Sequence, residues 1–453
     1  MSKIALLFLM VFAAGVVATF FYSGASAFLV YQLVYFLNPD SRWWSAEIPG
    51  LSYSFISAVL MLVAVGLKFR QYSELSPWRE QPIFKWAIGI VILYYLVGLI
   101  AIRPEVHFSV TFNYLKLVII VMVAYKLVNT RTLLDFALWA YVIGATYIGY
   151  LATSYGRGSG GRVEGIGMVD SPDANDTAAA LVPAGAILLY FFWMGNKKVK
   201  LACIFCGALI ANGLVLINSR GAFLGIASSA GLYLIYMTFS KYRRKGQRAV
   251  AIFTVILGIS GGLYVADDTF WERMSTLKNV EDQETSGSSR VNFWIAALDM
   301  SAEHPFGLGV DGFNMLAELY VPQEYLSGTV YKSVHSMWMQ GLTEVGWLGL
   351  IFLLAMLLSL WRLSRRAKQW VLDQGENEAY FKLLALECAL FGYLVAGSFI
   401  NRFRAEILYW MIVFLAIGIN VYFLQKVRGQ KQARGIAVGR RGRSLRNSKG
   451  VSV

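Results

Sequence analysis

Apolar runs of about 17–25 residues recur along almost the whole chain, and this feature limits the possible folds more than any other. Each run is long enough for a helix to cross the hydrocarbon of a bilayer. None shows the roughly ten-residue alternation of an outer-membrane barrel. Of the 453 residues, 57% are hydrophobic and 15% are charged, too few polar groups to cover a water-soluble domain. The sequence therefore predicts an all-α, polytopic integral membrane protein.

We expect about twelve transmembrane helices. The N-terminal stretch 4–37 is almost continuously apolar, and we count it as one net crossing with Lys3 inside. Ala25, Ser26 and Ala27 resemble a signal-peptidase site, but the apolar run continues past them, so cleavage is not expected. The other spans are predicted at about 51–69, 86–102, 108–128, 132–152, 177–194, 201–217, 222–239, 249–266, 336–361, 384–400 and 406–425.

Short basic segments set the predicted orientation, because cytoplasmic loops are enriched in Lys and Arg. The segments 197–200, 241–248 and 362–368 are separated by even numbers of spans and therefore share the cytoplasmic side. The tail at 426–449 has nine Lys and Arg and no acid, and parity puts it there too, so both termini are expected to be cytoplasmic. The segments that then face outward are 153–176, 218–221, 267–335 and 401–405.

These features divide the chain into four parts. We expect transmembrane helices with short loops at 1–266, one large and partly helical outer loop at 267–335, the last transmembrane helices at 336–425, and a basic disordered tail at 426–453. The outer loop has eleven Asp and Glu against four Lys and Arg. We interpret the net charge of +14 as orientation bias and attraction to membrane lipids, and we expect no nucleic-acid partner.

Three outward residues suit work on an anionic, lipid-borne substrate. Arg220 lies at a tight junction between two spans, and Arg290 opens an amphipathic helix. Two guanidiniums on one face can hold phosphate oxygens in a bidentate manner. His335, where the outer loop re-enters the membrane, can act as a general base. Each of the three has a structural alternative. Arg220 can be an interfacial Arg that snorkels to the membrane surface, Arg290 can form a surface salt bridge, and His335 can have a structural role. His107 is a weaker candidate on the same face.

Four further outward residues are candidate sugar ligands. Asp311 lies among glycines and Tyr331 among aromatics, and Asp173 and Asn175 occupy the turn before the 177–194 span. The alternatives are an interfacial aromatic belt for the tyrosine and helix capping for the turn. No Asp, Glu and His cluster in the outer loop has convincing divalent-metal spacing, so we expect no metal and no cofactor. The Cys203 and Cys206 pair is mid-span and is interpreted as core.

In order along the chain, these residues resemble the pattern of the O-antigen ligase and O-antigen polymerase superfamily. That pattern comprises Ser-Arg-Gly at 219–221, Arg290 before an aromatic helix, Pro-Phe-Gly-Leu-Gly at 305–309, His335 with Ser336, and Glu-Val-Gly-Trp-Leu-Gly at 344–349. Phe-Leu-Asn-Pro at 36–39 and Trp-Glu-Arg-Met-Ser-Thr at 271–276 resemble a branch of O-glycosylation ligases associated with exosortase systems. The resemblance covers most of the chain and is most specific between about 170 and 350.

The resemblance implies a GT-C-like fold and an inverting, metal-independent glycosyl transfer at the periplasmic face of the bacterial inner membrane. The donor would be a glycan on undecaprenyl diphosphate. Arg220 and Arg290 would stabilise the charge on the diphosphate, and His335 would orient or deprotonate the acceptor hydroxyl. Ligation onto lipid A core, polymerisation of a polysaccharide and protein O-glycosylation use the same donor, and the sequence does not separate these acceptors.

Two classes of protein that catalyse no reaction are also compatible with the sequence. A transporter of lipid-linked glycans would also have about twelve helices and a basic cavity. It should carry ionisable residues in the middle of its spans, where Lys116 and Glu387 are the main examples here. A structural partner of a polysaccharide synthase would need no catalytic set and would tolerate the loss of His335.

Overall fold

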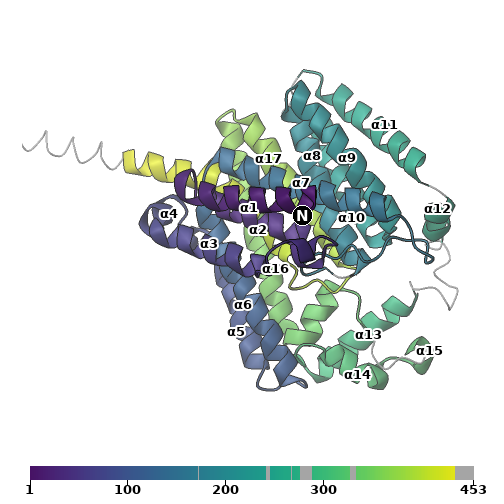
Figure 1. The fold of residues 1–453 in the computed structure, drawn as a ribbon. Helices are drawn as coiled ribbons and strands as arrows, with labels where there is room; N and C mark the ends of the chain where they lie inside the picture. Colours follow the sequence, from purple (N-terminus) through teal and green to yellow (C-terminus); the bar gives the residue numbers. More distant parts are fainter. Residues whose placement is uncertain (172, 241–244, 267, 276–287, 327–332, 434–453) are drawn as a thin grey trace, which may run out of the picture.

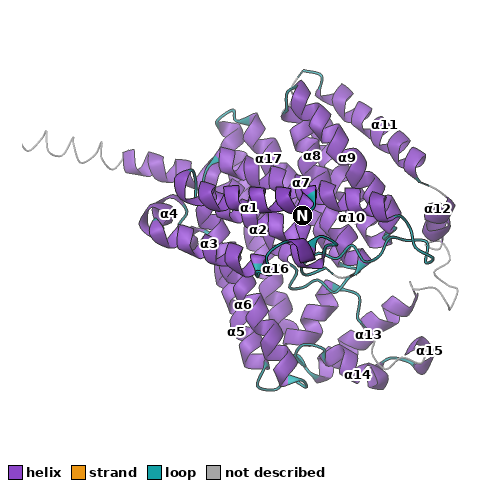
Figure 2. Ribbon diagram, in the orientation of Figure 1, coloured by secondary structure: helices purple, strands orange, loops and turns teal. Residues whose placement is uncertain are grey.

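The computed structural model describes residues 1–433 except 172, 241–244, 267, 276–287 and 327–332. This part of the chain consists of helices and loops, with one isolated bridge between Met168 and Ser171 (Figure 2). The predicted all-α, polytopic fold class is therefore confirmed.

Ten helices within the described residues are long and apolar enough to cross a membrane. The count rises to eleven if α3 (Tyr53–Leu67) and the helical segment Phe69–Glu80, bent by 85°, form one span. The apolar helix α5 (Pro82–Val97) is shorter, which accounts for part of the difference from the expected twelve. The ten are α1 (Lys3–Phe21), α6 (Pro104–Leu127), α7 (Arg131–Tyr155), α8 (Ala174–Met194), α9 (Lys197–Ile217), α10 (Arg220–Phe239), α11 (Gln247–Val265), α16 (Met337–Asp373), α17 (Asn377–Gly397) and the helix Glu406–Ala433, which begins with α18 (Glu406–Ile419).

The apolar N-terminal stretch forms two helices, α1 and α2 (Ala25–Leu37), instead of one long span. At the break between them, a Cβ on Gly24 would lie 2.6 Å from the Tyr72 hydroxyl oxygen, so the close packing there needs glycine. Helix α2 packs against α3 and α7, and both Ala25 and Ala27 are buried in it. The single net crossing of this stretch stays a prediction.

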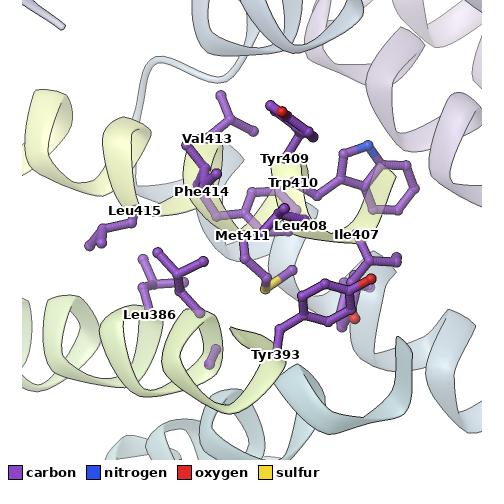
Figure 3. Close-up of a cluster of buried hydrophobic side chains, with 14 of the residues drawn as sticks. Leu386, Tyr393, Ile407, Leu408, Tyr409, Trp410, Met411, Val413, Phe414 and Leu415 are labelled. Carbon is purple, nitrogen blue, oxygen red and sulfur yellow. The ribbon is translucent and has the colours of Figure 1, made fainter. Parts of the chain in front are cut away.

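Helices α8, α10 and α17 pack closely against one another. Small residues permit this: a Cβ on Gly225 of α10 would lie 2.7 Å from the Gly392 carbonyl oxygen of α17. Helix α18 is almost fully buried beside α17, and Figure 3 shows side chains of the two helices in one cluster. The free thiols of Cys203 and Cys206 are buried, as expected of core residues.

The basic end of the chain differs from the prediction. The helix that contains α18 continues to Ala433, whereas disorder was expected from 426. Arg428 explains the added order, because its guanidinium pairs with Glu80 and donates to the Leu75 carbonyl oxygen at 2.6 Å. These contacts fasten the helix end to the segment before α5. The rest of the predicted tail lies outside the described residues.

The large segment between α11 and α16 contains α12 (Asp268–Ser275), α13 (Ser288–Glu303), α14 (Gly312–Tyr320) and α15 (Gln323–Leu326). Helices α13 to α15 lie together beside one end of α16 (Figure 1). They share a small core of their own, in which Phe293, Met300 and Phe313 are buried. This part is therefore a packed unit and not an open loop.

Helix α16 is interrupted where the outer segment docks. Val345 and Gly346 leave helical geometry, with a φ of +68° at Gly346. The backbone N–H groups of Leu308 and Gly309 donate to the carbonyl oxygens of Thr343 and Glu344 at 2.8 and 3.0 Å. The interruption leaves these carbonyls available, so residues 305–309 bind there in place of the next helical turn. The part before the break, 337–344, becomes a short separate helix directly after His335.

Candidate functional site

A cavity of about 190 Å³ lies where three segments predicted to face outward meet the end of α17. It is smaller than the roughly 300–1,000 Å³ of pockets that enclose drug-sized ligands, so it suits a head group and not a whole lipid-linked glycan. The segment after α7, the start of α8, the α9–α10 junction, the start of α13 and the end of α17 all contribute to it. The lining residues are Arg162, Asn175, Ala179, Ser219, Arg220, Gly221, Ala222, Arg290, Ala396, Phe399 and Ile400.

Arg220 reaches the cavity from the two-residue junction that the sequence predicted. Helix α9 ends at Ile217, Asn218 takes a left-handed conformation with φ +55°, and α10 begins at Arg220. The guanidinium therefore extends from the first turn of a helix, where backbone N–H groups and the helix dipole also favour an anion. A Cβ on Gly221 would lie 3.1 Å from the Phe399 side chain, so this glycine allows the α17 end to approach.

Arg290 reaches the same cavity from the first turn of α13. One turn further on, Trp294 donates through Nε1 to the Val334 carbonyl oxygen at 3.1 Å. Its ring also faces that of Phe399, with centroids 6.2 Å apart. Helix α13 therefore connects the cavity with the segment that carries His335.

His335 is half-buried and has a φ of +49°, a conformation that only a few per cent of non-glycine residues adopt. Asn401, in the segment between α17 and α18, forms hydrogen bonds with residues on both sides of His335 in the chain. Asn401 Oδ1 accepts from the Ser336 backbone N–H at 3.2 Å, and Asn401 Nδ2 donates to Ser333 Oγ. The chain on both sides of His335 is thus held at the start of the short 337–344 helix, beside the Trp294 contact, and His335 is not one of the residues that line the cavity.

The four predicted sugar ligands have different environments. Asn175 lines the cavity. Asp173 caps α8, since its Oδ1 accepts from the Asn175 backbone N–H at 2.7 Å, as the structural alternative proposed. Asp311 does not line the cavity and pairs with Arg103 at 3.3 Å. Tyr331 lies outside the described residues.

Sequence reasoning missed Arg162, which lines the cavity with only 15% of its side chain exposed. Its segment is fastened to α9, because the Val163 backbone N–H donates to the Leu216 carbonyl oxygen at 3.0 Å. A signal was present, since an Arg in a segment predicted to face outward is disfavoured by the same orientation bias that marked Arg220.

Arg402 was also missed, and it fixes the wall behind Asn175. Its guanidinium bonds the Asp170 carbonyl oxygen and pairs with the Asp176 carboxylate. Burial alone would lower the pKa of Arg402, but the Asp176 and Asp170 carboxylates reverse this and hold the pKa above its ordinary value. Arg402 therefore stays charged and ties the start of α8 to the segment before α18.

His107, the weaker candidate, is occupied by structural contacts. The imidazole is fully buried, and its Nδ1 accepts from the Val310 backbone N–H at 3.0 Å. The proton must then be on Nε2, which donates to the Tyr94 carbonyl oxygen at 2.7 Å. One nitrogen therefore bonds Val310 and the other bonds α5, and no lone pair remains for a substrate.

Lys116 and Glu387, the mid-span charges relevant to a transporter, have different environments. Lys116 is exposed, with its Nζ 5.0 Å from the Phe112 ring centroid. Glu387 pairs with Lys368. A second cavity, of about 310 Å³, lies toward the opposite ends of α8 and α17, where Lys382 and Arg131 are offset by acidic residues including Asp135, Glu376 and Glu378. Its lining therefore carries both signs of charge, whereas the charged residues that line the first cavity in the described part of the chain are arginines.

Residues 205–354 match the family model described as O-antigen ligase. The match covers 150 of the 453 residues and includes Arg220, Arg290 and His335. It confirms the resemblance to the O-antigen ligase superfamily that the sequence predicted. The described chain is thus a multi-pass membrane protein that is similar to O-antigen ligases over this part of its length. The narrower exosortase-associated branch stays a prediction. Comparison with curated proteins found no match.

Proposed function

We propose that the protein is an inverting, metal-independent glycosyltransferase that moves a glycan from undecaprenyl diphosphate to an acceptor hydroxyl. It would work at the periplasmic face of the bacterial inner membrane, with both termini in the cytoplasm. The observation that carries the proposal is the cavity lining, in which Arg162, Arg220 and Arg290 converge and no carboxylate takes part among the described residues. Such a lining favours an anionic head group.

In the proposed reaction, the acceptor oxygen attacks the anomeric carbon as the bond from that carbon to the diphosphate oxygen breaks. The proton of the acceptor hydroxyl passes to the imidazole of His335. The electron pair of the broken bond leaves with the diphosphate, whose negative charge Arg220 and Arg290 stabilise. Because a lipid diphosphate is already a good leaving group, most of the remaining acceleration comes from positioning the two substrates. Attack from the side opposite the leaving group inverts the anomeric configuration.

A reconstituted transfer assay tests this proposal. Purified protein in liposomes would receive a glycan on undecaprenyl diphosphate together with a lipid A core acceptor, a polysaccharide acceptor or a peptide acceptor. We expect one acceptor to gain the glycan with inverted anomeric configuration, with equal release of undecaprenyl diphosphate and no loss of rate in EDTA. Retention of configuration, or activity abolished by EDTA and restored by a divalent metal, would contradict the mechanism. Movement of intact donor across the bilayer without transfer would instead support the transporter alternative.

A further inference from the structure

The least expected feature of the cationic cavity is its third guanidinium, that of Arg162. This residue lies on the segment between α7 and α8, outside the part of the chain that matches the ligase family. The segment is fixed to the end of α9 by the bond from Val163 to Leu216 and by a second bond, in which Arg157 donates to the Val215 carbonyl oxygen at 3.1 Å. Arg162 is therefore part of a built wall and not of a loose loop.

The ion pairs of Arg162 are of a kind that a stronger anion can replace. Its Nε lies 2.9 Å from Glu164 Oε1 and its Nη2 lies 3.9 Å from Asp173 Oδ2. The guanidinium is 15% exposed, whereas the Glu164 and Asp173 side chains are 68% and 54% exposed. Exposed carboxylates are well solvated and contribute little as partners, while a mostly buried cation gains most from a close anion. The cation thus faces the cavity and its partners face the solvent.

We infer that Arg162 binds the donor's second phosphate and makes the site selective for lipid diphosphates over lipid monophosphates. This inference rests on the proposed function, because it assumes that the cavity takes the donor's head group. Two guanidinium forks supply enough donors for the oxygens of a single phosphate. A third fork on the same cavity therefore suits a head group with a second phosphate.

Equilibrium binding to the full-length protein in nanodiscs tests the inference, with undecaprenyl diphosphate and undecaprenyl monophosphate as the two probes. Arg162→Ala should weaken binding of the diphosphate lipid about tenfold or more, since hydrogen bonds between charged groups are strong. Binding of the monophosphate lipid should change less than about threefold, because this lipid has no second phosphate with which Arg162 could form such bonds. Arg162→Lys keeps the charge without the fork and should fall between the wild type and the alanine variant. The lysine variant also tests the inference if the alanine variant folds poorly.

Arg70→Ala is the matched control, because it removes a guanidinium that is 95% exposed and pairs with Glu74 far along the chain from the cavity residues. Its affinities should equal those of the wild type. Wild-type affinity for the diphosphate lipid in Arg162→Ala, or equal losses for both lipids, would overturn the assignment while leaving the proposed function intact if Arg220→Ala still abolishes binding. If the wild type binds neither lipid, both the inference and the proposed function fail.

Discussion

The side chain of Asn401 accepts a hydrogen bond from the backbone N–H of Ser336 at 3.2 Å. Its amide nitrogen donates to Ser333, so Asn401 holds the chain on both sides of His335. A φ of +49° at His335 is costly for a residue with a side chain, and it persists only where the surroundings fix it. The segment between α17 and α18 therefore positions the proposed base, although it lies far from it in the sequence.

Replacing Asn401 should impair the reaction more than substrate binding. We expect Asn401→Ala to lower kcat about 10- to 100-fold with little change in KM for the donor, because a small displacement of a catalytic group is enough for such losses. Asn401→Asp keeps an acceptor for the Ser336 N–H and should recover part of kcat. Steady-state kinetics of both variants measure this. A rise in KM for the donor of about 10- to 100-fold, without loss of kcat, would show that Asn401 acts on the donor and not on His335.

His335 itself should contribute as a general base. We expect His335→Ala to slow transfer by about 10²–10⁴-fold while undecaprenyl diphosphate still binds, because the arginines make the diphosphate contacts. In the wild type, acid should lower the rate, since the imidazolium cannot accept a proton. The alanine variant should lose this dependence. A variant with near-wild-type turnover would remove His335 from the mechanism.

Gly346 should be the most sensitive glycine of the docking site for residues 305–309. It has a φ of +68°, and a Cβ there would lie 2.2 Å from the Pro305 carbonyl oxygen. We expect Gly346→Ala to lower the free energy of unfolding by about 1–3 kcal/mol or more and to lower the thermal midpoint in detergent. Gly261→Ala in α11 is the control, because its Cβ would meet nothing within 4 Å and should be neutral or slightly stabilising. Equal midpoints for the two variants would contradict the docking account.

The orientation can be measured by cysteine labelling. Glu324 and Lys198 are both exposed, the first in the segment between α11 and α16 and the second in the first turn of α9. We expect an impermeant thiol reagent to label Glu324→Cys in intact spheroplasts and to label Lys198→Cys only after lysis, while the three native cysteines are buried and should react poorly. The reverse pattern would place the arginine cavity on the cytoplasmic side and end the periplasmic assignment.

The sequence was sufficient for the features that depend on local composition. Apolar length located most of the long helices to within a few residues, although α16 ends at Asp373 instead of 361 and α17 begins at Asn377 instead of 384. The distribution of basic residues grouped three segments that line the cavity. The junction at Arg220 followed from the absence of any linker between two apolar runs. Such features can be predicted because lipid imposes strict rules on length and charge, and the orientation itself stays a prediction.

Features that depend on packing between distant segments were not predictable in the same way. The role of Arg162 follows from the bond between Val163 and Leu216, and the pairing of Asp311 follows from the approach of Arg103. The order of residues 426–433 follows from the contact between Arg428 and Glu80. In each case the partner is remote in sequence, and no periodicity or composition indicates it.

The central claim is that Arg220 and Arg290 hold the donor's diphosphate through their guanidinium forks. The direct test is the transfer rate of Arg220→Lys and Arg290→Lys in the reconstituted assay, with Arg70→Lys as the control. Lysine keeps the charge but cannot bind two oxygens in one plane. The account predicts that both lysine variants fold and insert but lose most of their activity, while the control keeps the wild-type rate. Full activity in both variants would show that neither guanidinium binds the donor as proposed.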